Sequence, residues 1–169
     1  PMTATYILFD VMDTLVFDPA YTVLPSFFQE SIAKIWAGAN PLSWPAFEKG
    51  QSDEDEYFKN FFRDQRPFDG ARLKRELIEG YRWLEGMLEL LADLSESGLE
   101  MHILSNYPVW FEDIEAKLQL SRFLPWTFVS HKTGLRKPDP ESYIEAAKSL
   151  GKDLSAGLFI DDRAKNCEA

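Results

Sequence analysis

The sequence predicts an α/β fold with a doubly wound parallel sheet, and two patterns carry this prediction. Short apolar, β-prone runs alternate with longer segments in which apolar residues recur at helical spacing. Strands and helices in this alternation are typical of a parallel sheet covered by helices. In such a sheet ligands bind outside the carboxyl ends of the strands, so polar residues that directly follow a strand are the first candidates for a functional site.

Polar residues follow three of the four expected strands. The expected strands are residues 5–9, 100–104, 126–130 and 157–160. Asp10 follows the first strand, Ser105 the second, and Asp161 with Asp162 the last. Because the carboxyl ends of parallel strands share one edge of a sheet, we expect these side chains to converge on one crevice.

Three helices are expected among the later strands. Residues 84–94 place four leucines on one helix face, and residues 110–118 repeat apolar side chains at i, i+4 and i+8. In the third helix Asp139 is the expected N-cap with Pro140 in the first helical position, and Gly151 ends the helix. These segments complete the expected pattern of strands and covering helices.

The stretch from residue 16 to 83 has no clear strand pattern and is expected to be helical throughout. Its expected helices are residues 25–37, 43–49, 53–64 and 71–81, with a capping box formed by Ser52 and Asp55. The sequence therefore predicts a core of residues 1–15 and 84–169 and a helical cap of residues 16–83.

The expected cap is rich in aromatic residues. It holds 14 of the 24 aromatic side chains of the chain. Most of them are expected to pack the small cap's own core. The alternative is that some of them line a pocket for a flat ring.

Composition bounds the classes of function. A chain of 169 residues fits one domain with a small insert. The net charge of −10, with no block of lysine or arginine, excludes nucleic-acid binding driven by phosphate neutralisation. No apolar run approaches the roughly 20 residues of a membrane span. The single cysteine, Cys167, cannot form an internal disulfide, which suits the cytoplasm or the plastid stroma.

Four short motifs occur in the order typical of one enzyme superfamily. Phe9–Leu15 reads FDVMDTL, Ile103–Asn106 reads ILSN, Gly134–Pro140 reads GLRKPDP, and Phe159–Arg163 reads FIDDR. Each motif alone is weak, but the ordered set resembles the haloacid dehalogenase superfamily. That resemblance implies a Rossmann-like core with a cap inserted after the first strand.

The resemblance also implies a magnesium-dependent phosphatase. Asp10 would be the nucleophile that forms an aspartyl phosphate. Mg²⁺ would be held by Asp10, the backbone carbonyl of Met12 and Asp162. Lys137 would act in catalysis by neutralising the phosphate, and Ser105 and Asn106 would donate hydrogen bonds to its oxygens. Arg136 and Arg163 are expected at the surface.

One position departs from the family pattern. The second aspartate of the first motif, which protonates the leaving oxygen in family phosphatases, is replaced by Met12. Three explanations stay open: Asp13 swings in as a substitute, the leaving group needs little protonation, or the domain has become a binding or structural subunit of a larger complex. General acid–base catalysis is worth roughly 10² to 10⁴ in rate, so the loss is large.

A narrower resemblance concerns the substrate. The first motif, Phe27-Phe28, the Phe47–Gly50 stretch and Arg136–Pro140 look like the chloroplast flavin mononucleotide (FMN) hydrolases of plants and algae. This implies that the partner is a small phosphorylated metabolite such as FMN. FMN releases a primary alcohol, a poor leaving group whose departure would be helped by an acid. The resemblance to FMN hydrolases and the absence of an acid at Met12 therefore disagree.

Overall fold

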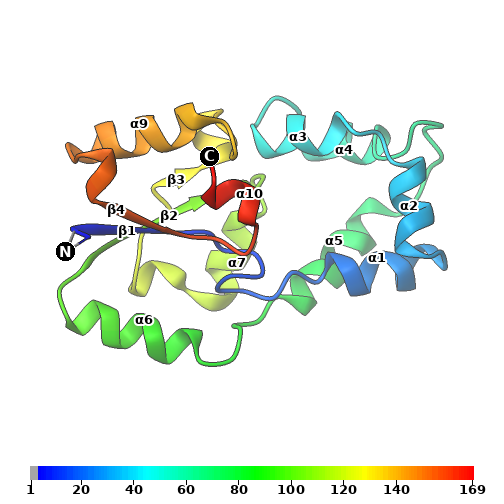
Figure 1. The fold of residues 1–169 in the computed structure, drawn as a ribbon. Helices are drawn as coiled ribbons and strands as arrows, with labels where there is room; N and C mark the ends of the chain where they lie inside the picture. The colour runs from blue at the N-terminus through cyan, green and yellow to red at the C-terminus, as the bar shows by residue number, and fades with distance from the viewer. Residues whose placement is uncertain (1–3) are drawn as a thin grey trace.

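The computed structural model describes residues 4–169, and its four strands form one parallel sheet. The strands are β1 (Tyr6–Phe9), β2 (Glu100–Ser105), β3 (Phe128–Val129) and β4 (Gly157–Ile160), in the spatial order β3-β2-β1-β4 (Figure 1). Every pairing is parallel. The predicted α/β fold with a parallel sheet is therefore confirmed, with β3 shorter than expected.

Helices cover both faces of the sheet because β1 is apolar on both sides. Ile7 and Phe9 point into one hydrophobic cluster, whereas Tyr6 and Leu8 point into a second, as the two-residue period of a strand requires. The first cluster includes side chains of α6 (Met87–Glu96) and α7 (Phe111–Leu118), and the second those of α9 (Pro140–Leu150). Figure 1 shows α9 on one side of the sheet and α6 on the other.

Short helical turns complete the sheet region. They are η1 (Leu120–Arg122), α8 (Ser130–Thr133), η2 (Leu154–Ala156) and α10 (Ala164–Cys167). Helix α9 begins as the sequence predicts: the Asp139 side chain accepts a hydrogen bond from the Glu141 amide, Pro140 is the first helical residue, and Gly151 ends the helix at φ 65°. A positive φ suits glycine, which has no Cβ to clash with the backbone.

The first five helices lie together beside the carboxyl ends of the strands (Figure 1). They are α1 (Ala20–Phe28), α2 (Ile32–Gly38), α3 (Ser43–Glu48), α4 (Glu54–Lys59) and α5 (Gly70–Gly80). The chain enters and leaves this helical region through two adjacent segments. The Phe17 amide donates to the Arg82 carbonyl, and the Leu84 amide donates to the Leu15 carbonyl, each at 2.9 Å.

Three details of this helical region differ from the sequence predictions. Helix α4 ends at Lys59, whereas the predicted helix ran over residues 53–64. The single helix predicted over residues 25–37 is two helices, because Gln29 is left-handed at φ 53° and Ser31 caps a new helix at the Lys34 amide. The predicted capping box is also wrong. Asp53 is the N-cap of α4 and accepts from the Glu56 amide at 2.8 Å, whereas Ser52 lies outside the helix.

Aromatic side chains form much of the interior of the helical region. Phe47 is fully buried and stacks on Tyr57 with ring centroids 4.6 Å apart. Trp110, at the start of α7, meets Phe47 edge-on at 5.1 Å. Packing between these rings joins the helical region to the sheet region, so the aromatic side chains do more than fill the core of the five helices.

Candidate active site

Two carboxylates and one ammonium group meet at the carboxyl ends of β1 and β4. These strands pair with Phe9 opposite Ile160, so Asp10 and Asp161 emerge side by side. The Lys137 Nζ donates to Asp10 Oδ1 at 2.8 Å and to Asp161 Oδ2 at 2.7 Å. The Lys137 side chain is only 2% exposed. A buried ammonium that contacts two carboxylates neutralises part of their charge and holds them in place.

Lys137 is positioned by Asn106, which follows β2. The Asn106 side chain accepts from the Lys137 amide at 2.8 Å and donates to the Lys137 carbonyl at 2.9 Å. These two hydrogen bonds fix the backbone of Lys137 from a residue 31 positions earlier in the chain. Asn106 was predicted to bind phosphate; the structure instead places its amide group on the Lys137 backbone, and only its second N–H remains for a ligand.

Ser105, the last residue of β2, has a different environment. It is 2% exposed, and its hydroxyl oxygen has no hydrogen-bond partner among the described residues. A buried hydroxyl without a partner is costly. A bound group with acceptor oxygens would satisfy it, which fits the phosphate-binding role predicted for Ser105.

Burial and neighbouring charges shift the pKa values of the three carboxylates in different directions. Burial raises the pKa of Asp10 to about 6, although the Lys137 ammonium opposes this rise. Burial also acts to raise the pKa of Asp161, but Lys137 and hydrogen bonds from Arg163 and Asn166 outweigh it and hold that pKa below its usual value. Burial and the nearby Asp161 raise the pKa of Asp162.

The same carboxylates could hold a divalent cation. Oxygen atoms of Asp10, Asp161 and Asp162 all lie within 4.8 Å of one another. Carboxylate oxygens are the ligands that Mg²⁺ prefers, so the donor set fits the predicted metal. Asp161 is the least free of the three, because both its oxygens already accept hydrogen bonds from Asn166, and one of them also from Lys137. One oxygen of Asp10 also accepts from Lys137.

The loop after β1 shows what surrounds Met12. Asp13 is left-handed at φ 55°, and its carboxylate accepts a hydrogen bond from the Asp18 amide at 2.9 Å. Thr14 accepts from the Asp162 amide at 3.1 Å and so ties this loop to β4. The Met12 side chain packs against the hydrophobic core. In this arrangement Asp13 stabilises the loop rather than standing in the place of an acid at position 12.

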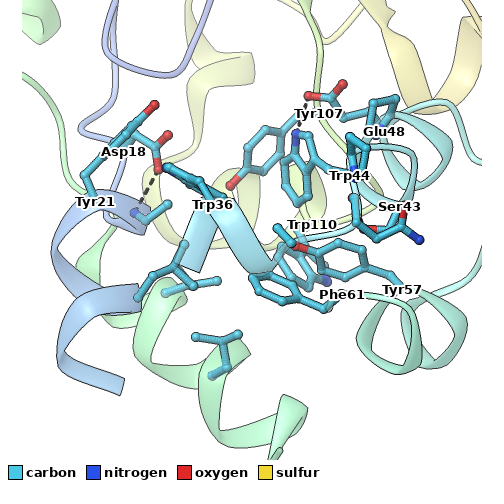
Figure 2. A pocket seen from close by; sticks show the side chains of 18 of the residues that line it. Asp18, Tyr21, Trp36, Ser43, Trp44, Glu48, Tyr57, Phe61, Tyr107 and Trp110 are labelled. Atoms are coloured by element: carbon cyan, nitrogen blue, oxygen red, sulfur yellow. Dashed lines mark hydrogen bonds between the residues drawn. The ribbon is translucent and has the colours of Figure 1, made fainter. Parts of the chain in front are cut away.

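A cavity of about 390 Å³ lies between the five helices and the carboxyl edge of the sheet. Its aromatic walls include Trp36, Trp44, Tyr57, Phe61 and Tyr107, several of which surround the hollow in Figure 2. Its volume falls within the range of roughly 300–1,000 Å³ that is usual for small-molecule sites. The aromatic side chains of the helical region therefore do both: many pack its interior, as expected, and some also line a cavity.

The residues of the carboxylate cluster do not themselves line the cavity, but two of their sequence neighbours do. Arg136 and Arg163 line it, and they are the sequence neighbours of Lys137 and Asp162. Arg136 was predicted to lie at the surface; its side chain is 32% exposed, and its guanidinium also contacts the buried Glu48 carboxylate of α3. The sequence contained no signal for this ion pair, because 88 residues separate its partners.

Comparison with known proteins identifies the family. Residues 5–169 match the model of the haloacid dehalogenase-like hydrolases. The chain belongs to this family. The superfamily resemblance predicted from the four motifs is therefore confirmed.

Relatives of this haloacid dehalogenase-like chain include phosphatases. The chain is 47% identical over 160 residues to flavin mononucleotide hydrolase 1 of Arabidopsis thaliana, a protein named as chloroplastic. This match covers 95% of the present chain and 65% of the Arabidopsis protein. The chain is also 33% identical to an N-acetylmuramic acid 6-phosphate phosphatase of Pseudomonas putida, over 58% of this chain and 44% of that protein. The chain thus spans less than two thirds of the length of these relatives.

Solved structures of the same family share the fold. A haloacid dehalogenase family enzyme of Bacteroides thetaiotaomicron, in a magnesium complex, superposes with a TM-score of 0.76 at 17% identity, over 98% of this chain and 87% of that one. The putative hydrolase YfnB of Bacillus subtilis, bound to magnesium, superposes with a TM-score of 0.70 at 24% identity, over 97% of this chain and 82% of that one.

Among the described residues, no helix has the length and apolar character that a membrane crossing requires.

Proposed function

We propose that this protein is a Mg²⁺-dependent phosphatase that hydrolyses FMN through a phosphorylated Asp10. The observation that carries the proposal is the buried contact of Lys137 with Asp10 and Asp161 beside an aromatic cavity. The name of the Arabidopsis relative, at 47% identity, supports the choice of FMN. That relative is chloroplastic by name, so we also propose the plastid stroma as the compartment.

Each residue has a proposed part in the reaction. An oxygen of Asp10 attacks phosphorus, the bond between phosphorus and the ester oxygen breaks, and riboflavin leaves with a proton taken from water. Water then attacks the phosphoaspartate, which releases inorganic phosphate and restores Asp10. Lys137 offsets negative charge, and Ser105 and the second N–H of Asn106 bind phosphate oxygens.

The proposed metal completes the charge balance. Mg²⁺, held by Asp10, the Met12 carbonyl and Asp162, would reduce the repulsion between the attacking carboxylate and the phosphate. The residues that would hold it belong to the proposed core of residues 1–15 and 84–169. The proposed cap, residues 16–83, supplies most of the aromatic walls of the cavity.

The test is phosphate release from FMN. We expect the purified chain to release phosphate in the presence of Mg²⁺, and chelation of the metal to stop the release. Asp10→Asn should abolish it, whereas the matched substitution Asp93→Asn, at an exposed position of α6, should leave it unchanged. Absence of turnover of FMN and of a broad panel of phosphate esters would argue against the proposal.

Met12 favours a second candidate function. A methionine cannot donate a proton, so the domain would keep the residues that hold phosphate while losing part of the apparatus that cleaves it. In that case the protein would be a binding or structural subunit of a larger complex. Co-purification as a fixed component of an assembly, together with inertness towards phosphate esters, would favour this candidate over the phosphatase.

A further inference from the structure

Arg136 is one of the polar residues in the cavity wall that the proposed reaction does not use. Its Nε donates to the Glu48 carboxylate at 2.5 Å. A guanidinium group has five N–H donors and no acceptor. Within residues 4–169, no hydrogen-bond acceptor contacts its two terminal nitrogens, so four donors remain for a ligand in the cavity.

Glu48 has the environment of a positioning residue. It lies at the end of α3 and is 4% exposed. One of its carboxylate oxygens accepts from the Trp44 indole N–H and the other from Arg136. Figure 2 shows the hydrogen bond between Trp44 and Glu48, with the Tyr107 ring beside the Trp44 indole. A single buried carboxylate therefore orients both a cation and an aromatic wall of the cavity.

The backbone around Glu48 is anchored to the sheet region. Its carbonyl accepts a hydrogen bond from the Ser130 hydroxyl at 2.6 Å, and that hydroxyl accepts from the Tyr107 amide at 2.9 Å. Gly50, at φ 67°, passes so close to α8 that a Cβ there would lie 2.9 Å from the His131 carbonyl oxygen. These contacts keep the Glu48 carboxylate, and with it Arg136, in one place.

The position of Arg136 along the cavity indicates what it contacts. It precedes Lys137, so its Cα lies about 3.8 Å from that of the residue whose ammonium meets Asp10. Its guanidinium contacts Glu48, whose carboxylate also accepts from the Trp44 indole. Arg136 and Trp44 both line the cavity, so a ligand with its phosphate at Asp10 and a flat ring among the aromatic walls would have its connecting segment near Arg136.

We infer that Arg136, oriented by Glu48, is a specificity-determining residue that donates hydrogen bonds to the hydroxyl groups of a polyol joining phosphate to ring. Arginine is always charged and can only donate, so it favours a segment rich in acceptors over an apolar linker. The inference rests on the proposed function and narrows its substrate class to phosphate esters of a ring-bearing polyol.

The experiment compares two substrates and one product. FMN carries the polyol, phenyl phosphate has a ring but no polyol, and riboflavin probes binding through quenching of its fluorescence without any turnover. Arg136→Ala should weaken riboflavin binding and raise KM for FMN about tenfold, the effect expected for a lost charged hydrogen bond. Its effect on phenyl phosphate should be far smaller.

Matched variants separate a specificity role from a merely structural one. Glu48→Gln should show the same substrate pattern with a smaller loss, and Arg136→Lys should restore part of the riboflavin affinity. Arg75→Ala, at an exposed position of α5, is the control and should behave as the parent does. Circular dichroism melting checks that each variant folds.

Two results overturn the inference, and they are distinct from failure of the proposed function. Equal losses on FMN and phenyl phosphate would show that Arg136 only supports Lys137. An unchanged riboflavin affinity in Arg136→Ala would show that the side chain does not contact the polyol. Failure of the parent protein to release phosphate from FMN would instead refute the proposed function, and this is measured before any variant.

Discussion

Replacement of Asp10 by asparagine should stabilise the protein while removing the proposed phosphatase activity. Burial raises the pKa of Asp10 from its ordinary value of 3.8 to about 6, against the opposing effect of Lys137. A difference of about 2 pKa units corresponds to about 3 kcal/mol, since each unit is worth about 1.36 kcal/mol. Ionisation of Asp10 in the folded protein therefore lowers the free energy of unfolding.

The sign follows from proton binding in the two states. Between about pH 4 and pH 6 the folded protein keeps the Asp10 proton that the unfolded chain has released. The free energy of unfolding therefore falls as the pH rises through this window. Asparagine carries no such proton. Asp10→Asn should exceed the parent by up to about 3 kcal/mol at pH 7.5, and by much less near pH 4.

Urea unfolding followed by tryptophan fluorescence measures this difference. Both proteins are unfolded at pH 4, 6 and 7.5 in the presence of a chelator, because a bound cation would favour the ionised carboxylate. Asp93→Asn, at an exposed position of α6, is the control and should not differ from the parent. An Asp10→Asn variant that is no more stable than the parent at pH 7.5, or whose advantage does not shrink towards pH 4, would refute the reasoning.

Three further substitutions have defined outcomes. Met12→Asp should raise phosphate release from FMN by roughly 10²-fold, and no gain in a steady-state assay would show that the missing acid is not what limits the reaction. Asn106→Ala removes both hydrogen bonds to the Lys137 backbone and should slow phosphate release by up to about 10²-fold without loss of helix content, which circular dichroism monitors. Phe47→Ala, at a fully buried ring stacked on Tyr57, should cost about 3–5 kcal/mol in urea unfolding, whereas Leu42→Ala at a mostly exposed site should cost little.

Much of the fold and part of the site could be predicted from local patterns. The strand runs and the cap of α9 depend on residues close together in sequence, and the structure places β1, β2, β4 and α9 within one or two residues of the predicted bounds. Asp10, Ser105 and Asp161 could be singled out because each stands at or directly after the end of a strand. The long helix predicted over residues 25–37 was wrong because apolar spacing alone does not reveal the left-handed turn at Gln29.

Side-chain partners across the fold could not be predicted in the same way. Nothing near Asn106 in sequence indicates that its amide group binds the Lys137 backbone, and nothing near Arg136 indicates a buried partner on α3. Such contacts depend on how helices pack against the sheet, which is set by the sum of many buried contacts.

The sequence by itself determined the α/β class, the family and the carboxylates at the strand ends, because these depend on local periodicity and on motifs in a fixed order. Only the tertiary structure decided how Lys137 is held, where Asp13 points and which walls enclose the cavity. Those features join residues from separate elements, and their geometry exists only once the helices have packed against the carboxyl edge of the sheet.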